Sequence, residues 1–120
     1  MISEFISRAF AIRDAAHFAH WSTDSGFHHE VLGGFYESVI GLTDRFVEAY
    51  IGNFDTIPAV TTQGGKLKDA KSFLKLLEAD VVWMAENEDK ICEELDVLEN
   101  ILQEIQELYL STVLKLKRYK

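Results

Sequence analysis

Apolar residues recur along this chain at the three- and four-residue spacing that is typical of amphipathic helices. The pattern predicts a first helix over residues 2–22 and a second over 26–51. It predicts a third helix over 66–86 and a fourth over 89–117. The second helix has the longest apolar stripe, made of Val31, Leu32, Phe35, Val39, Leu42, Phe46 and Tyr50. The sequence therefore predicts one all-α domain, a four-helix bundle.

The breaks between these segments differ in length. A short polar run at 22–26 separates the first two helices, and a polar turn at 86–89 separates the last two. We expect Gly52 to end the second helix, because glycine is common just after a helix C-terminus. The stretch 52–65 then forms a long connection, and a segment of this length can reach back along a helix of ~38 Å. It resembles the crossover of a ferritin-like bundle, which would make the second and third helices run roughly parallel.

Composition and charge narrow the classes of partner. The net charge of −8 opposes binding to nucleic acid and to an anionic membrane surface. A single cysteine, Cys92, gives no internal disulfide and no sign of an oxidising compartment. No apolar run approaches the ~18 residues of a membrane span, and the N-terminus lacks the features of a signal peptide. We expect a cytoplasmic protein, in the host cytoplasm if a phage encodes it.

All four histidines lie between positions 17 and 29: His17, His20, His28 and His29. His17 and His20 are three residues apart, so they share a helix face, and the other two open the next helix. Neutral imidazole is a common ligand of transition metals. The spacing leaves two interpretations open, which are a metal site and four ordinary polar aromatic residues at a helix corner.

Asp44 and Glu48 add two carboxylates on one face of the second helix, although carboxylates at this spacing usually face solvent. Asp44 lies ~22 Å from His29 along a continuous helix, and Glu48 lies farther still, too far to share a metal ion with His29 within one chain. Two copies of this helix packed antiparallel about residue 37 or 38 would bring His29 of one chain to both acids of the other. The pair Gly33–Gly34 near that point would permit close helix approach at ~1 kcal/mol per glycine.

These residues resemble the Dps family of miniferritins, in which a His-Trp pair ends the first helix. A second histidine, a tyrosine, and an Asp and Glu four residues apart then follow on the second helix. The matching positions are His20 with Trp21, then His29, Tyr36, Asp44 and Glu48. Residues 17–52 also resemble small phage-encoded ferritin-like proteins. The resemblance covers only the first 52 residues or so. The link from His20 to His29 is shorter than in miniferritins, and no lysine-rich arm for DNA binding precedes the first helix.

The resemblance implies a ferroxidase-type site between subunits, with the histidines from one chain and the acids from the other. The sequence hypothesis is thus a homodimer, or a larger homo-oligomer, that binds iron or another divalent transition metal. The ligands are His20, His29, Asp44 and Glu48, with His17 as a further ligand, and oxidation of ferrous iron is an activity such a site supports. The alternative is a metal-free interaction protein, a phage-type accessory bundle that binds another protein through the acidic face of its third and fourth helices.

Overall fold

The computed structural model describes residues 1–62 and 70–120, with side chains from Ser72 onward in the second part. It contains four α-helices: α1 (Ile2–Ser22), α2 (Gly26–Phe54), α3 (Ala70–Cys92) and α4 (Asp96–Arg118). The all-α four-helix bundle predicted from the sequence is confirmed. No helix in the described part of the chain is long and apolar enough to cross a membrane.

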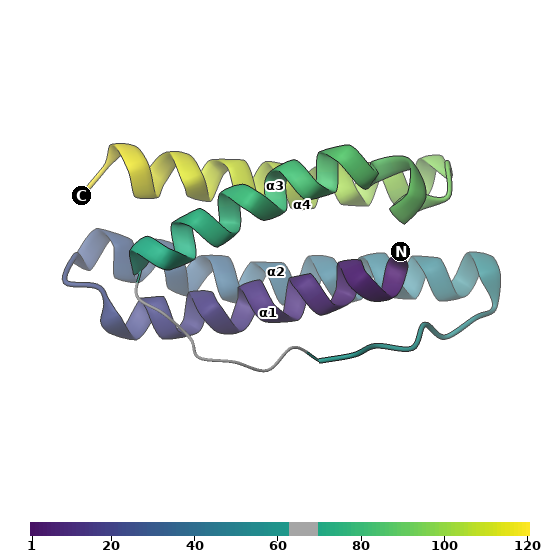
Figure 1. The fold of residues 1–120 in the computed structure, drawn as a ribbon, viewed down its shortest axis with the longest axis horizontal. Helices are drawn as coiled ribbons and strands as arrows, with labels where there is room; N and C mark the ends of the chain where they lie inside the picture. Colours follow the sequence, from purple (N-terminus) through teal and green to yellow (C-terminus); the bar gives the residue numbers. More distant parts are fainter. Residues whose placement is uncertain (63–69) are drawn as a thin grey trace.

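The four helices form a bundle with principal extents of 45 × 27 × 22 Å. Helix α1 packs against α2 and α3, and α4 packs against the same two helices from the opposite corner. Figure 1 shows α2 and α3 running in the same direction, as the crossover hypothesis requires. Residues 63–65 of the predicted crossover, and the predicted helix start at 66, lie outside the described residues.

Two predicted helix ends are wrong, and both helices run further than expected. Helix α2 passes through Gly52 and ends at Phe54, whose ring packs on Tyr50, and Asp55 then adopts a left-handed conformation with φ of 49°. Helix α3 continues through the predicted turn at 86–89 and ends only at Cys92, so α4 begins at Asp96 and not at 89.

The predicted turn at 86–89 contains four polar residues but no glycine or proline, so nothing in it stops a helix. Asn87 donates a hydrogen bond from Nδ2 to the carbonyl of Trp83 within the helix. Ile91 and Cys92 continue the apolar stripe and are fully buried. Burial of these two side chains therefore decides where the helix ends.

The actual turn between α3 and α4 places two glutamates in the left-handed region of backbone conformation. Glu93 has φ of 50° and Glu94 has φ of 59°. The amide of Glu94 donates to the carbonyl of Asp89, which is the closing hydrogen bond of a Schellman motif. This conformation costs residues with a Cβ roughly 1–2 kcal/mol, and glycine adopts it freely. The turn is therefore strained relative to the same turn with glycine.

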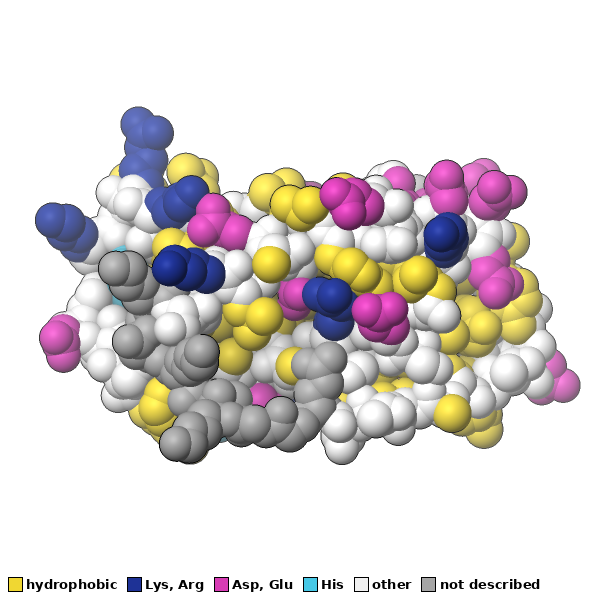
Figure 2. Space-filling model, viewed as in Figure 1, with side chains coloured by type: hydrophobic (Ala, Val, Ile, Leu, Met, Phe, Trp, Pro, Cys, Tyr) yellow, Lys and Arg dark blue, Asp and Glu magenta, His cyan; other side chains and the backbone are white. Residues whose placement is uncertain are grey.

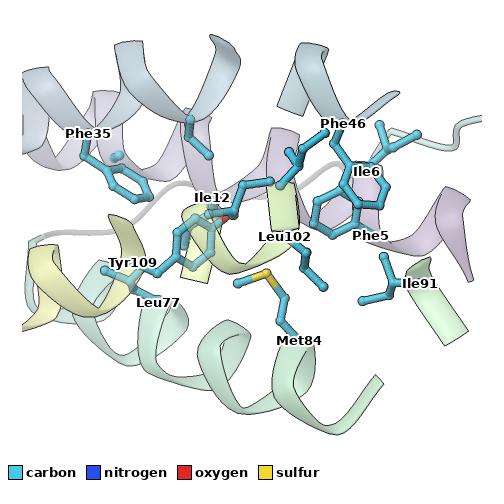
Figure 3. Close-up of a cluster of buried hydrophobic side chains, with 14 of the residues drawn as sticks. Phe5, Ile6, Ile12, Phe35, Phe46, Leu77, Met84, Ile91, Leu102 and Tyr109 are labelled. Carbon is cyan, nitrogen blue, oxygen red and sulfur yellow. The ribbon is translucent and has the colours of Figure 1, made fainter. Parts of the chain in front are cut away.

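The core runs the length of the bundle and receives side chains from all four helices, as Figure 3 shows. Phe35 packs at 5.3 Å between ring centroids on Tyr109 and at 5.6 Å on Phe73, which joins α2, α4 and α3. Phe5 packs on Phe46 at 4.9 Å and joins α1 to α2. These aromatic contacts fix the relative heights of the helices.

One carboxyl group lies inside this apolar packing. Asp80 on α3 is 3% exposed and accepts a hydrogen bond of 2.9 Å from the Arg8 guanidinium on α1. The Arg8 guanidinium also lies 4.3 Å from the Trp83 ring centroid, a cation–π distance. Burial raises the pKa of Asp80 to about 6, although the hydrogen bond and the charge of Arg8 act in the opposite direction.

Charged side chains separate toward the two ends of the bundle. Figure 2 shows Lys and Arg side chains over the end where the chain terminates and many acidic side chains over the opposite end. The basic end includes Lys115, Lys117 and Arg118 of α4, and the acidic end includes Glu93 and Glu94. Lysine and arginine at the C-terminus of α4 complement the helix dipole.

We expect Glu93→Gly to stabilise the chain by about 0.5–1 kcal/mol, because glycine adopts the left-handed conformation without strain. Urea denaturation followed by circular dichroism measures the change. Glu93→Gln separates the contribution of charge, and Glu107→Gly, in the exposed middle of α4, should lose about 1 kcal/mol. Equal destabilisation by both glycine variants would contradict the left-handed turn.

The raised pKa of Asp80 predicts a specific dependence of stability on pH. The folded chain holds this proton more tightly than the unfolded chain, so the contribution of Asp80 to stability falls as the pH rises from about 4 to about 6. Asp80→Asn removes that dependence. Between pH 4 and 7 the stability of the variant relative to wild type should improve by roughly 2–4 kcal/mol. Urea denaturation at a series of pH values tests this, with exposed Asp24→Asn as control. Parallel profiles for Asp80→Asn and wild type would contradict it.

Candidate metal centre

The corner between α1 and α2 carries the histidines and is built by local hydrogen bonds. Ser25 caps the N-terminus of α2, where its Oγ accepts a hydrogen bond of 3.1 Å from the amide of His28. The amide of Ser25 in turn donates to Oγ1 of Thr23. A side-chain cap of this kind satisfies an amide that has no partner within the helix. The three-residue link therefore begins α2 with a defined orientation relative to the end of α1.

His20 and His29 hold each other across this corner. Nδ1 of His20 donates to the carbonyl oxygen of His29 at 2.6 Å, and Nδ1 of His29 donates to the carbonyl oxygen of His20 at 2.8 Å. The two rings are stacked, with centroids 3.6 Å apart and planes inclined by 18°. We call this arrangement the histidine lock. It ties the last turn of α1 to the first turn of α2 by side chain and backbone together.

The histidine lock determines which ring nitrogen carries the proton in each neutral imidazole. A carbonyl oxygen only accepts hydrogen bonds, so each Nδ1 must carry the proton. In the neutral ring this leaves the lone pair on Nε2, and no described residue donates a hydrogen bond to either Nε2 atom. An imidazole that donates from Nδ1 to a backbone carbonyl is oriented as metal-binding histidines usually are. Both rings are therefore ready to act as ligands through Nε2.

Gly33 makes room for the histidine lock. A Cβ atom at position 33 would lie 3.1 Å from Cε1 and 3.3 Å from Nδ1 of His20. A side chain here would push the His20 ring away from its hydrogen bond. The neighbouring Gly34 has nothing within 4 Å of the same hypothetical atom. Gly33 and Gly34 thus differ in their surroundings, although the sequence predicted close helix approach at both.

His17 lies beside the histidine lock and is held by aromatic stacking. Its ring stacks on Tyr36, with centroids 4.2 Å apart and planes inclined by 13°, and contacts Trp21 at 4.5 Å. The His17 and His20 ring centroids are 6.3 Å apart. Three of the predicted metal ligands are therefore gathered at one corner, together with the tyrosine and tryptophan of the quoted pattern.

His28 is directed away from this group. Its Nε2 donates to the carbonyl of Tyr119 at 2.5 Å, which ties the N-terminus of α2 to the end of α4. The Phe27 and Tyr119 rings meet edge to face at the same place. With Nε2 engaged by a carbonyl, His28 serves as a structural contact between helices.

The predicted carboxylates lie far from the histidines in the same chain. Asp44 and Glu48 are exposed on the second half of α2, which is one continuous helix from Gly26 to Phe54. Helical rise puts Asp44 ~22 Å from His29. In the described part of the chain, no group of three or more histidine, cysteine or acidic side chains could hold a metal ion. Within one chain the histidines lie together, but Asp44 and Glu48 lie too far away to join them at one metal ion.

The acids and His29 nevertheless lie on one stripe of α2. His29, Gly33 and Glu37 follow at four-residue spacing, as do Ile40, Asp44 and Glu48, so all six lie on one side of α2. This α1–α2 face also exposes large apolar side chains. Trp21 is 69% exposed, Phe10 41% and Ile40 38%. Gly34 lies on another side, in the groove between α2 and α4.

Sequence reasoning missed two residues of this corner, Gly33 in its actual role and Ser25 as the cap of α2. A glycine four residues after His29 was a usable signal, because a gap in the side-chain surface one turn along a helix admits a ring from a neighbouring helix. The exchange of hydrogen bonds between side chains and carbonyls left no trace in the sequence, because it depends on the exact angle of the corner.

Comparisons with known proteins locate the chain in one family. No curated protein and no solved structure matches it. A family model, described as a family of unknown function, DUF5856, matches residues 20–116, which include the histidine lock, the acids and the whole of α3. The chain therefore belongs to the DUF5856 family of unknown function.

Proposed function

We propose that this protein binds a divalent transition metal, with iron as the expected ion, at two symmetric sites in a homodimer. Each site takes His20 and His29 from one chain and Asp44 and Glu48 from the other. The observation that carries the proposal is the histidine lock, which engages Nδ1 of both rings and leaves Nε2 of each as the remaining ligand atom at a partly exposed corner. Backbone-anchored imidazoles of this kind suit a metal site.

A second chain is needed because α2 is rigid. Its backbone hydrogen bonds run unbroken from Gly26 to Phe54, so Asp44 cannot fold back onto His29. An antiparallel partner helix about residue 37 would bring both acids to the histidine lock while the exposed Trp21, Phe10 and Ile40 gain cover. Burial of such side chains favours association by about 25 cal/mol per Å² of apolar surface.

The stacked geometry favours one imidazole per metal ion. Lone pairs of Nε2 lie in the ring plane, so two nearly parallel rings do not aim at a common point. The two rings would therefore take separate ligand positions. Asp44 and Glu48 of the other chain would supply oxygen ligands and negative charge, with His17 as a further ligand.

The resemblance to Dps proteins and to ferritin-like bundles supports the same assignment of residues. It also supports an activity, the oxidation of ferrous iron by an external electron acceptor such as dioxygen, in which carboxylate oxygens favour the ferric state and imidazole suits the ferrous state. Tyr36 and Trp21, in contact with His17, are placed to take up oxidising equivalents.

The in-trans site can be tested by mixing two defective chains. We expect His29→Ala and Asp44→Ala/Glu48→Ala each to lose most ferrous-iron binding, measured by elemental analysis and near-ultraviolet titration. When equal amounts are refolded together, half of the dimers are mixed, and each mixed dimer keeps one complete site. Binding should then return to about one quarter of the wild-type level. No recovery from the mixture, with intact binding by wild type, would exclude an in-trans site.

The two glycines provide a matched pair for the histidine lock. Gly34→Ala meets open space and should stabilise α2 by up to about 1 kcal/mol. Gly33→Ala gains the same helix propensity but displaces the His20 ring, so it should be less stable than Gly34→Ala and should lose metal affinity. Urea denaturation and ferrous-iron titration of both variants measure this. Equal metal affinity in the two variants would show that the histidine lock is not the site.

A second candidate function is a metal-free protein that binds a partner through α3 and α4. Exposed Val82, Leu110 and Leu114 on these helices favour it. Elemental analysis of the purified protein and a ferrous-iron titration separate the two functions. Absence of both bound metal and a titration response would favour the interaction protein.

A further inference from the structure

Arg13 is an unusual residue on the α1–α2 face. Its Nε atom is shielded from solvent and is the one such buried side-chain nitrogen or oxygen among the described residues that has no hydrogen-bond partner. Among the described residues, the guanidinium pairs only with Asp14, its neighbour in sequence, at 3.5 Å, which is longer than a normal hydrogen bond. A shielded donor without an acceptor is unfavourable, because it has lost its hydrogen bonds to water. The single chain therefore leaves Arg13 incompletely paired.

The antiparallel register of α1 and α2 shows where Arg13 lies. His17 is level with Tyr36, and His20 is level with Gly33. One turn before His17, Arg13 is therefore level with Ile40, about two residues' rise from the middle of the stripe that includes His29 and Asp44.

Glu37 occupies the middle of that stripe. It is exposed, and none of the ion pairs among the described residues includes it. In the antiparallel dimer about residue 37, the two copies of Glu37 face each other. Like charges in contact oppose association, so the dimer needs a cation at this level.

We propose that Arg13 forms an ion pair with Glu37 of the partner subunit, twice, across the two-fold axis. The inference rests on the proposed dimer and names the contact that sets its register. Two arginines and two glutamates form a neutral group at the centre of the interface. This group holds each histidine lock level with the acids of the other chain. The partly exposed guanidinium of Arg13, and not its shielded Nε, would make this contact.

Charge reversal tests the contact directly. In Arg13→Glu homodimers two glutamates would meet, and in Glu37→Arg homodimers two arginines would meet. We expect each variant to weaken dimerisation at least about thirtyfold by analytical ultracentrifugation, because a buried interfacial charge loses its partner. Arg45→Glu is the control, since Arg45 pairs with Glu104 of α4, and it should dimerise like wild type.

Mixing the two single variants gives the decisive result. In a mixed dimer the glutamate introduced at position 13 of one chain faces the arginine introduced at position 37 of the other, and the second contact keeps the native pair. The mixture should therefore form heterodimers close to wild-type strength, although neither variant forms homodimers. Wild type that dimerises and binds metal in trans while the single reversals leave dimerisation unchanged would overturn only this inference. A wild type that stays monomeric at high concentration would overturn the proposed function as well.

Discussion

The two hydrogen bonds exchanged by His20 and His29 are the interaction on which the corner between α1 and α2 depends. They join the last turn of α1 to the first turn of α2, and they determine three further features. They place the proton of each neutral ring on Nδ1. They require a residue without a side chain at position 33, and they hold His20 one turn from His17, which stacks on Tyr36. A change in the angle of this corner would alter all of these features together.

The bundle could be predicted from the sequence because helix periodicity is a property of whole segments. Helix α1 begins and ends where the spacing places it, and the helix order follows from the two short links and the long one. Helix ends were less predictable. Gly52 looks like a terminator but lies inside α2, and the polar run 86–89 looks like a turn but lies inside α3. In both places the burial or contact of later side chains, Phe54 and Ile91, outweighs the local signal.

The gathering of the candidate histidines was predictable, but their arrangement was not. The clustering of His17, His20 and His29 in sequence predicts that they meet at one corner, and the structure brings them together there, because a three-residue link leaves little freedom. The separation of His28 from that group depends on the end of α4, which no local pattern encodes. The contacts of exposed acids such as Asp44 are even harder to predict, because in the proposed site only a second chain brings them to the histidines.

The free energies involved indicate how much the histidine lock contributes to the stability of the fold. Two partly exposed hydrogen bonds contribute about 0.5–1.5 kcal/mol each, and the exposed position of His29 favours the low end. Gly33, which the lock requires, costs about 1 kcal/mol relative to alanine in a helix. As a device for stability the arrangement therefore gains little over an alanine at 33 with an ordinary packed corner. In the proposed site, the Nε2 atoms of both rings would act as ligands, and the same chain could not supply Asp44 and Glu48 because α2 is one continuous helix. The proposal of a second copy follows from that rigidity.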